Sequence, residues 1–115
     1  MTSDVILYGI KTCDTMKKAR AALKARDVAY VFHDYKTAGI SRDKLESWVR
    51  EAGWEKLINR SGTTFRKLPQ AQREDLDQER AVALMLAHPS MIKRPVLETK
   101  GRVVIGFDPA IYDQI

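Results

Sequence analysis

The 115-residue sequence contains a single cysteine, Cys13, and two histidines, His33 and His88. One cysteine cannot form a disulfide within the chain, which excludes a small disulfide-stapled extracellular scaffold. The histidines have no cysteine close to them, so the ligands for a structural zinc site are too few. We therefore expect no bound metal, and a lone free thiol favours a reducing compartment, the cytoplasm.

Long apolar runs are also missing. No stretch approaches the roughly 18 consecutive apolar residues that a membrane-spanning helix needs. Residues 1–4 lack the basic and then apolar segments of a secretory signal. We expect a cytoplasmic protein that is neither secreted nor anchored to a membrane. The length, the 44% hydrophobic content and the lack of repeats predict one compact domain over residues 1–115.

The charge is positive but not segregated. The net charge is +5, and the basic residues are spread along the chain among 15 acidic ones. A nucleic-acid-binding surface usually clusters its cations on one face or along one helix. The pattern therefore favours a mixed, solvated surface over a nucleic-acid partner, and it also suits a small anionic substrate.

The first third of the chain predicts a strand, a helix and a second strand. The apolar run Val5–Tyr8 is typical of a central strand buried on both faces, and Gly9 ends it. Apolar and small residues recur at helical spacing over 14–26, so Cys13 lies where a strand gives way to a helix. Residues 28–35 alternate and are rich in aromatic and β-branched side chains, which predicts a second, parallel strand.

A helical block and a hairpin complete the predicted fold. We expect a helix capped by Ser41 and ended by Gly53, followed by a short helical turn. Residues 59–69 predict an ordered loop, and a helix is expected over 78–88. Largely apolar segments at 96–97 and 102–105 flank the turn residues 99–101, which predicts an antiparallel hairpin. A short helix is expected from Pro109. The result is an α/β fold with a four-stranded mixed sheet, half parallel and half antiparallel.

Cys13 is the first candidate for chemistry. An inert buried thiol is the alternative, because cysteine is among the most buried residue types. A helix N-terminus, however, presents free amide N–H groups and a positive dipole end, which stabilise a thiolate and lower the thiol pKa. Lys11 would add a cation, whereas Asp14 would oppose it. We predict that Cys13 is catalytic and has a lowered pKa.

Arg94 precedes Pro95 at the expected start of a strand. Proline disfavours the helical region for the residue before it, so Arg94 should be extended. The peptide bond between them is open to either isomer. Arg94 is a candidate for binding a ligand, and the alternative is an ordinary surface arginine beside a strand-edge proline. In either case we expect an exposed side chain without a partner in the protein.

Three segments carry a family resemblance when they are taken together. They are Tyr8–Thr15, Gly62–Leu68, and His88-Pro89 followed by Ile92–Pro95. An early cysteine with a late His-Pro and Arg-Pro resembles the arsenate reductase and Spx family, most closely its YffB-like branch, over essentially the whole chain. The resemblance implies a thioredoxin-like fold with a helical insertion at about 41–92 between the two halves of the sheet.

The resemblance also implies a reaction. In the glutathione-dependent arsenate reductases of this family, a thiolate attacks the oxyanion, arginines hold it, and glutathione and then glutaredoxin resolve the adduct. Cys13 matches the nucleophile and Arg94 the arginine before the proline. Arg60 matches the arginine of the helical insert, with Arg66 as its rival.

The chain departs from this pattern at two places. Gly106 and Phe107 stand where the family has a third oxyanion arginine, which predicts weak arsenate reduction. Met16 stands where some Spx-like regulators carry the second cysteine of a redox switch, so that switch is absent. An arsenate reductase is one alternative, and a non-catalytic regulator that binds RNA polymerase is a second, disfavoured one.

We therefore predict an oxidoreductase, a glutathione-dependent thiol reductase without a tightly bound cofactor. Since the chain has no second cysteine, an external thiol must resolve the adduct. Glutathione is the expected co-substrate, and glutaredoxin is a further candidate partner. The predicted substrate-binding residues are Lys11, Thr12, Thr15, Arg60, Arg66, Lys93, Arg94 and Pro95.

Overall fold

The computed structural model describes residues 5–11 and 13–115, and it divides the chain into two compact units. The first unit comprises the chain up to Ala38 together with Arg94–Ile115, and the second comprises Gly39–Lys93. Within the described residues, no helix has both the length and the apolar character needed to cross a membrane. The two units are described separately below.

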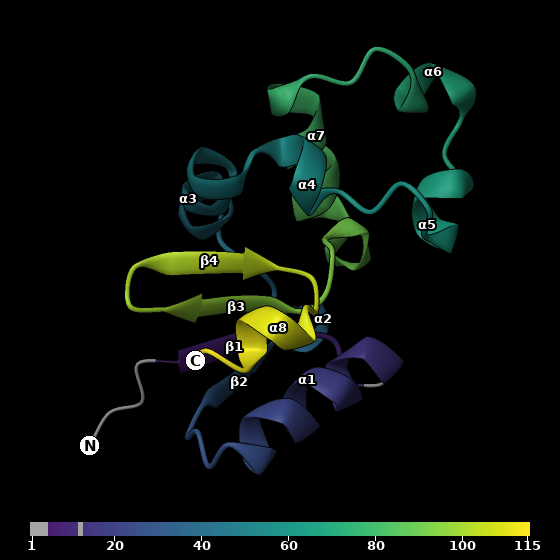
Figure 1. The fold of residues 1–115 in the computed structure, drawn as a ribbon. Helices are drawn as coiled ribbons and strands as arrows, with labels where there is room; N and C mark the ends of the chain where they lie inside the picture. The colour runs from purple at the N-terminus through teal and green to yellow at the C-terminus, as the bar shows by residue number, and fades with distance from the viewer. Residues whose placement is uncertain (1–4, 12) are drawn as a thin grey trace. The chain divides into compact units, whose positions relative to one another are not determined.

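The first unit contains a four-stranded mixed sheet (Figure 1). Its strands are β1 (Val5–Gly9), β2 (Val31–Asp34), β3 (Val96–Thr99) and β4 (Arg102–Ile105), in the spatial order β2-β1-β3-β4. β1 is parallel to β2 and antiparallel to β3, and β3 is antiparallel to β4. The predicted sheet, with one parallel and one antiparallel half, is confirmed.

The register of the sheet gathers three chain segments at one end. Gly9 at the end of β1 lies opposite Asp34 at the end of β2, and Tyr8 lies opposite Val96 at the start of β3. The segments that follow β1 and β2 and the segment that precedes β3 therefore meet at the same end of the sheet, on the right in Figure 1.

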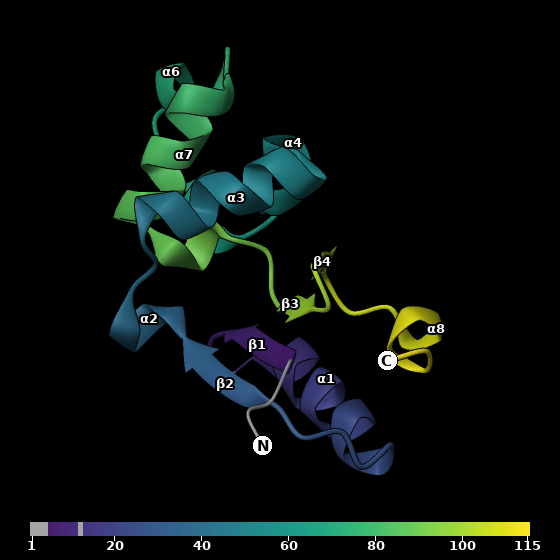
Figure 2. The same ribbon diagram turned by 90° about the vertical axis from the view of Figure 1, so that its left-hand side faces the viewer.

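Helices α1 (Asp14–Ala25) and α8 (Pro109–Tyr112) cover one face of this sheet (Figure 2). The buried positions of α1 are three and four residues apart, so they form one stripe toward the strands. Phe107 and other half-buried apolar side chains surround this core. The core cluster consists of Val5, Leu7, Met16, Ala19, Leu23, Leu97, Val104 and Tyr112.

The hairpin between β3 and β4 turns on two residues with positive φ, Lys100 at 49° and Gly101 at 75°. A two-residue turn with positive φ at both positions matches the right-handed twist of the strands that it joins. The predicted hairpin is thus confirmed, and a glycine stands at one of the two positions that need the left-handed region.

The second unit is helical. Its elements are α3 (Arg42–Ala52), α4 (Trp54–Leu57), α5 (Thr63–Arg66), α6 (Gln70–Arg73), α7 (Gln78–Ala87) and the 3-10 turn η1 (Pro89–Met91). α3 packs against α4 and α7, and α7 leads into η1. An isolated antiparallel bridge between Ile58 and Ile92, both fully buried, joins the segments after α4 and η1.

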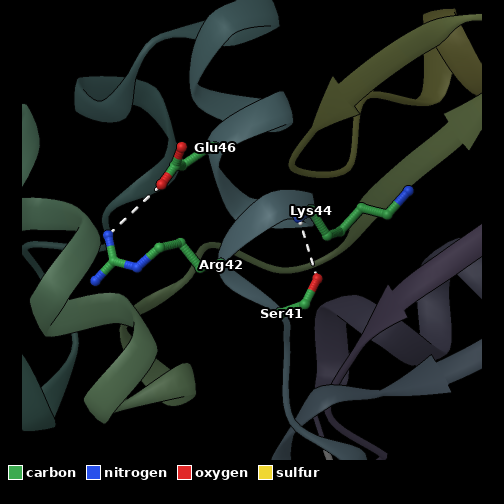
Figure 3. Close-up of polar contacts among 4 residues, drawn as sticks. All are labelled: Ser41, Arg42, Lys44 and Glu46. Carbon is green, nitrogen blue, oxygen red and sulfur yellow. Dashed lines mark hydrogen bonds and ion pairs between the residues drawn. The ribbon is translucent and has the colours of Figure 1, made fainter.

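The start of α3 follows the predicted cap (Figure 3). The Ser41 Oγ accepts a hydrogen bond from the Lys44 N–H at 3.1 Å, which satisfies one of the free donors of the first turn. Arg42, the first residue of the helix, forms an exposed ion pair with Glu46 at 3.6 Å. Pairs of this kind stabilise a helix by only about 0.3–0.5 kcal/mol, so the Ser41 cap contributes more to the stability of α3 than the ion pair does.

Both predicted ends of the second strand, and the predicted loop over 59–69, are wrong. β2 begins at Val31 rather than at residue 28, because the Val28 N–H donates to the Leu23 carbonyl at 2.9 Å and Asp27 turns the chain at a φ of 60°. The predicted loop over 59–69 contains the short helix α5, whose Phe65 is buried. The short helices α6 and α2 (Tyr35–Ala38) were not predicted, and the strand expected to end at Tyr35 gives way to α2 there.

Candidate active site around Cys13

Cys13 is the N-cap residue of α1. Its backbone is extended, with φ −93° and ψ 133°, and its carbonyl accepts the first helical hydrogen bond from the Lys17 N–H at 3.2 Å. The Cys13 N–H donates to the Ile10 carbonyl at 3.4 Å, which closes the turn after β1. The half-buried thiol therefore lies at the beginning of the helix, where the amide N–H groups of the first turn have no helical acceptor.

The pKa of Cys13 is lowered from its ordinary value. Burial is the largest single influence, and by itself it would raise the pKa. Hydrogen bonds from the Met16 N–H, the Arg94 side chain and the Thr15 N–H, together with the Arg94 charge, stabilise the thiolate and outweigh it. The two amides are the predicted contribution of the helix N-terminus.

Arg94 lies immediately before β3, and the Arg94-Pro95 peptide bond is cis. Its side chain is half-buried and makes hydrogen bonds to Cys13 and to the Tyr35 hydroxyl. The expectation of an exposed Arg94 without a partner is therefore wrong. The reason is the sheet register, which brings the start of β3 beside the ends of β1 and β2.

Pro95 is buried, and its carbonyl accepts a hydrogen bond from the Gly106 N–H at 2.8 Å. This bond joins the residue before β3 to the residue after β4. It therefore adds one backbone hydrogen bond to the hairpin beyond the paired residues of the two strands. The backbone that carries Arg94 is therefore attached to both strands of the antiparallel half.

Tyr35 is the residue of this site that sequence reasoning missed. Its side chain is fully buried, and burial raises its pKa well above the ordinary value, although Arg94 acts in the opposite direction. The signal in the sequence was the predicted pair of parallel strands. Residues that follow the carboxyl ends of parallel strands meet at one edge of the sheet, and Tyr35 directly follows β2.

Met16 contributes its backbone to the site and its side chain to the core. The side chain is fully buried, and a Cβ atom added at Gly9 would collide with the Met16 sulfur. Gly9 thus allows α1 to lie close to β1. The position that holds a second cysteine in some regulators is here a core methionine whose amide N–H points to Cys13.

The other predicted site residues fall into two groups. Lys11, in the first unit, is exposed. The cation that lowers the pKa of Cys13 is Arg94, whereas the sequence suggested Lys11. Thr12 lies outside the described residues. Thr15 acts through its backbone N–H. The residues Arg60, Arg66 and Lys93 belong to the second unit, and their role in the site stays a prediction.

Among these three, Arg60 has the most defined surroundings. Its guanidinium lies over the Trp54 ring, 5.5 Å from the ring centre. Arg66 lies at the end of α5, and both arginines are exposed. The Lys93 N–H donates to the Leu57 carbonyl at 2.7 Å, and its side chain is exposed. A guanidinium stacked on an aromatic ring loses less freedom when it binds an anion, which favours Arg60 over Arg66.

The residues at the place of the missing third arginine have structural roles. Gly106 has a φ of +82°, which side chains other than glycine rarely adopt. Phe107 packs against the core cluster, with its ring edge on Tyr112 at 4.9 Å between ring centres. A side chain at Gly106 would therefore meet open space but strain the backbone, and one at Phe107 would replace a ring that packs on the core. Within the described residues, no group of three or more His, Cys, Asp or Glu side chains is placed to hold a metal ion.

Comparison with known proteins identifies the family. The model of the ArsC family matches residues 8–115. The chain belongs to the ArsC family. This ArsC-family protein is 59% identical to the solved structure of a YFFB protein, with a TM-score of 0.92 and 96% of each chain covered. An arsenate reductase (ArsC) related protein from Brucella melitensis is 50% identical, with a TM-score of 0.80 and 99% and 95% of the two chains covered.

A curated relative of the ArsC-family protein carries a different description. The global transcriptional regulator Spx of Streptococcus mutans is 31% identical over 106 residues, which are 90% of this chain and 77% of the regulator. The thioredoxin-like fold of the ArsC family is thus established, and the relatives support either a thiol-based reductase or an Spx-like role.

Proposed function

We propose that this protein is a glutathione-dependent thiol reductase in which Cys13 is the nucleophile. The observation that carries the proposal is the set of donors around the Cys13 sulfur. Two amide N–H groups and the Arg94 guanidinium stabilise the thiolate and lower the thiol pKa despite partial burial. A structural cysteine in a core would be surrounded by apolar groups instead and would have a raised pKa.

The reaction is thiol-disulfide exchange in two steps. The Cys13 thiolate attacks one sulfur of a disulfide between glutathione and a second thiol compound, forming a bond from Cys13 to glutathione. The second compound leaves as a thiolate and takes up a proton. The thiolate of another glutathione then attacks the mixed disulfide, which releases oxidised glutathione and restores the Cys13 thiolate.

Glutathione binding needs cations because the molecule carries two carboxylates. Arg94 lies beside the Cys13 sulfur, and a guanidinium pairs well with a carboxylate, so Arg94 is the first candidate. Lys11, Thr12 and Thr15 lie next to Cys13 in the sequence and are the further candidates of this segment. Arg60, Arg66 and Lys93 are the candidates of the second unit, with glutaredoxin as a candidate protein partner in the cytoplasm.

Arsenate reduction is the first alternative, supported by the description of the Brucella relative. A tetrahedral dianion beside a thiolate needs several guanidinium groups to offset the repulsion between the two negative charges. Gly106 and Phe107 supply none at the place where a third arginine would stand. We therefore rank arsenate below a disulfide of glutathione as the substrate.

Transcriptional regulation is the second alternative, supported by the Spx relative. A regulator of this kind would bind RNA polymerase and would not need turnover at Cys13. Met16 occupies the position of a second thiol and fills the core, so an internal redox switch cannot form at that place. A pull-down with purified RNA polymerase tests this alternative directly.

The deciding experiment is incubation with oxidised glutathione, followed by intact mass measurement. The proposal expects one added glutathione on the wild-type protein and none on the Cys13→Ser variant. It also expects turnover of a mixed disulfide of glutathione and 2-mercaptoethanol, coupled to NADPH through glutathione reductase. A protein that gains no glutathione and shows no turnover above the Cys13→Ser background is not a thiol reductase.

A further inference from the structure

Tyr35 is buried in a segment that is otherwise exposed. It is fully buried, although it begins a short helix whose next three residues are exposed. The parallel register puts Asp34, the residue before it, opposite Gly9. The Tyr35 side chain is thereby kept at the end of the sheet where β1 runs into the Cys13 turn.

Arg94 connects this tyrosine to the sulfur. It makes a hydrogen bond to the Tyr35 hydroxyl oxygen and another to Cys13, and the negative charge of Cys13 acts on Tyr35 in turn. All three residues belong to the first unit. A guanidinium has its donors in one rigid plane, so two fixed acceptors determine how that plane is oriented.

We propose that Tyr35 is a positioning residue for the Cys13–Arg94 pair, with a buried hydroxyl that holds the guanidinium beside the sulfur. This inference rests on the proposed function only in assigning the thiolate a catalytic task. When Cys13 forms a mixed disulfide, the sulfur loses its charge and with it most of its attraction for Arg94. Tyr35 then keeps the guanidinium in place, and the released donors are available for a glutathione carboxylate.

The charged groups that act on Tyr35 are Arg94, Cys13 and Asp34. Burial and the two negative groups keep the phenol neutral, so its oxygen remains an acceptor that does not compete with the thiolate for the Arg94 charge. A carboxylate at the same position would pair with Arg94 and reduce its effect on Cys13. A neutral acceptor orients the cation without neutralising it.

The test uses Tyr35→Phe, which keeps the buried ring and removes the acceptor. Tyr30→Phe is the matched control, because the Tyr30 hydroxyl also accepts from an arginine, Arg20 Nε at 3.1 Å. The readout is the alkylation rate of Cys13 against pH. We expect the midpoint to rise by about 0.5–1 pH unit in Tyr35→Phe, since a loosened donor stabilises the thiolate less, and to stay unchanged in Tyr30→Phe.

A double variant separates positioning from packing. In the Arg94→Ala background, Tyr35→Phe should cause no further shift of the midpoint, because the group that it positions is gone. Tyr35→Met, which also lacks an acceptor, should reproduce the shift in the wild-type background and serves if Tyr35→Phe fails to fold. An unchanged midpoint in the folded single variant, or an equal shift without Arg94, overturns the inference. An ordinary midpoint in the wild-type protein would instead count against the proposed function.

Discussion

The sulfur of Cys13 is surrounded by donors that come from two distant parts of the chain. The Thr15 and Met16 amides belong to the same helix turn, and the Arg94 side chain comes from the residue before β3. Local hydrogen bonds depend only on the helix start, whereas the arginine depends on the sheet. The two contributions can therefore be separated by substitution.

The first prediction concerns the pKa of Cys13. A lowered pKa means that the thiolate predominates above a lower pH than for an ordinary thiol, so the alkylation midpoint should lie below about 8.5. Arg94→Ala removes a hydrogen bond and a positive charge and should raise the midpoint, while the helix amides keep part of the effect. Arg20→Ala, which removes the arginine at Tyr30, is the control. A wild-type midpoint at or above 8.5 would contradict the prediction.

The second prediction concerns Met16. Replacing it by cysteine would create a Cys-x-x-Cys motif but also shorten a fully buried side chain against Gly9. We expect the reduced Met16→Cys protein to lose about 1–3 kcal/mol of unfolding free energy in urea, because a cavity replaces core contacts.

Met16→Leu is the volume-conserving control and should cost less than about 1.5 kcal/mol. If the cysteine variant were as stable as the wild type under reducing conditions, the Met16 side chain would not fill the core as described.

The end of the sheet is an assembly of element termini. α1 begins there after β1, α2 begins there after β2, and β3 starts there after the cis Arg94-Pro95 bond. Helix and strand termini expose unpaired backbone donors and acceptors, which is why reactive groups are often placed at them. At the core, α8 packs on α1 and on the same face of the sheet, with Tyr112 as its buried anchor.

The third prediction concerns Tyr112 in α8. Its hydroxyl is buried, burial raises its pKa, and among the described residues it has no hydrogen-bond partner. A buried polar group without a partner is destabilising by about 1–3 kcal/mol. Tyr112→Phe should therefore leave the unfolding free energy unchanged or raise it, whereas Tyr112→Ala should lower it by about 3–5 kcal/mol.

Urea unfolding measures both Tyr112 variants. A loss of more than about 1 kcal/mol in Tyr112→Phe would mean that the hydroxyl has a stabilising partner and would contradict the prediction.

The whole molecule divides into a unit that holds Cys13, Tyr35 and Arg94 and a helical unit that holds Arg60, Arg66 and Lys93. Among the described residues, the groups that lower the thiol pKa, namely Thr15, Met16 and Arg94, all belong to the first unit. Binding of an oxyanion dianion beside a thiolate needs several arginines, because their positive charges must offset the repulsion between the two negative groups.

The fourth prediction concerns substrate choice by the intact protein. Each missing contact to a charged group costs about 1.5–3 kcal/mol, or one to two powers of ten in affinity or rate. We expect arsenate reduction, measured by NADPH oxidation with glutathione and glutaredoxin, to be weak while Cys13 still exchanges with glutathione disulfides. Strong arsenate turnover by the unmodified protein would show that another cation replaces the third arginine, and the reductase proposal would give way.

Adding the missing arginine is less simple than the sequence suggests. At Gly106 an arginine would have to adopt a φ of +82°, which is strained for any side chain. At Phe107 it would remove a ring from the core cluster. Either variant should lower the melting temperature, so a gain in arsenate activity is meaningful only when the folded fraction is measured beside it.

Local pattern was enough to predict the strands and the long helices. The buried run of β1, the cap of α3 and the turn at Lys100 and Gly101 depend on neighbouring residues. The short helices α2 and α5 were not predicted, although the equally short α4 and α8 were expected as a helical turn and a short last helix. Four residues form too few internal hydrogen bonds to be stable alone, so packing decides whether such a segment is helical. The buried side chains of Tyr35 and Phe65 hold α2 and α5 in place.

For the site, the sequence determined that Cys13 begins a helix, and with that the two amide donors at its sulfur. The partner of that thiol was decided only by the tertiary structure. Arg94 and Tyr35 are far apart in the chain, and no local pattern relates them. They meet because β1 pairs with β2 on one side and β3 on the other, which brings the segments after β1 and β2 and the segment before β3 to one end of the sheet.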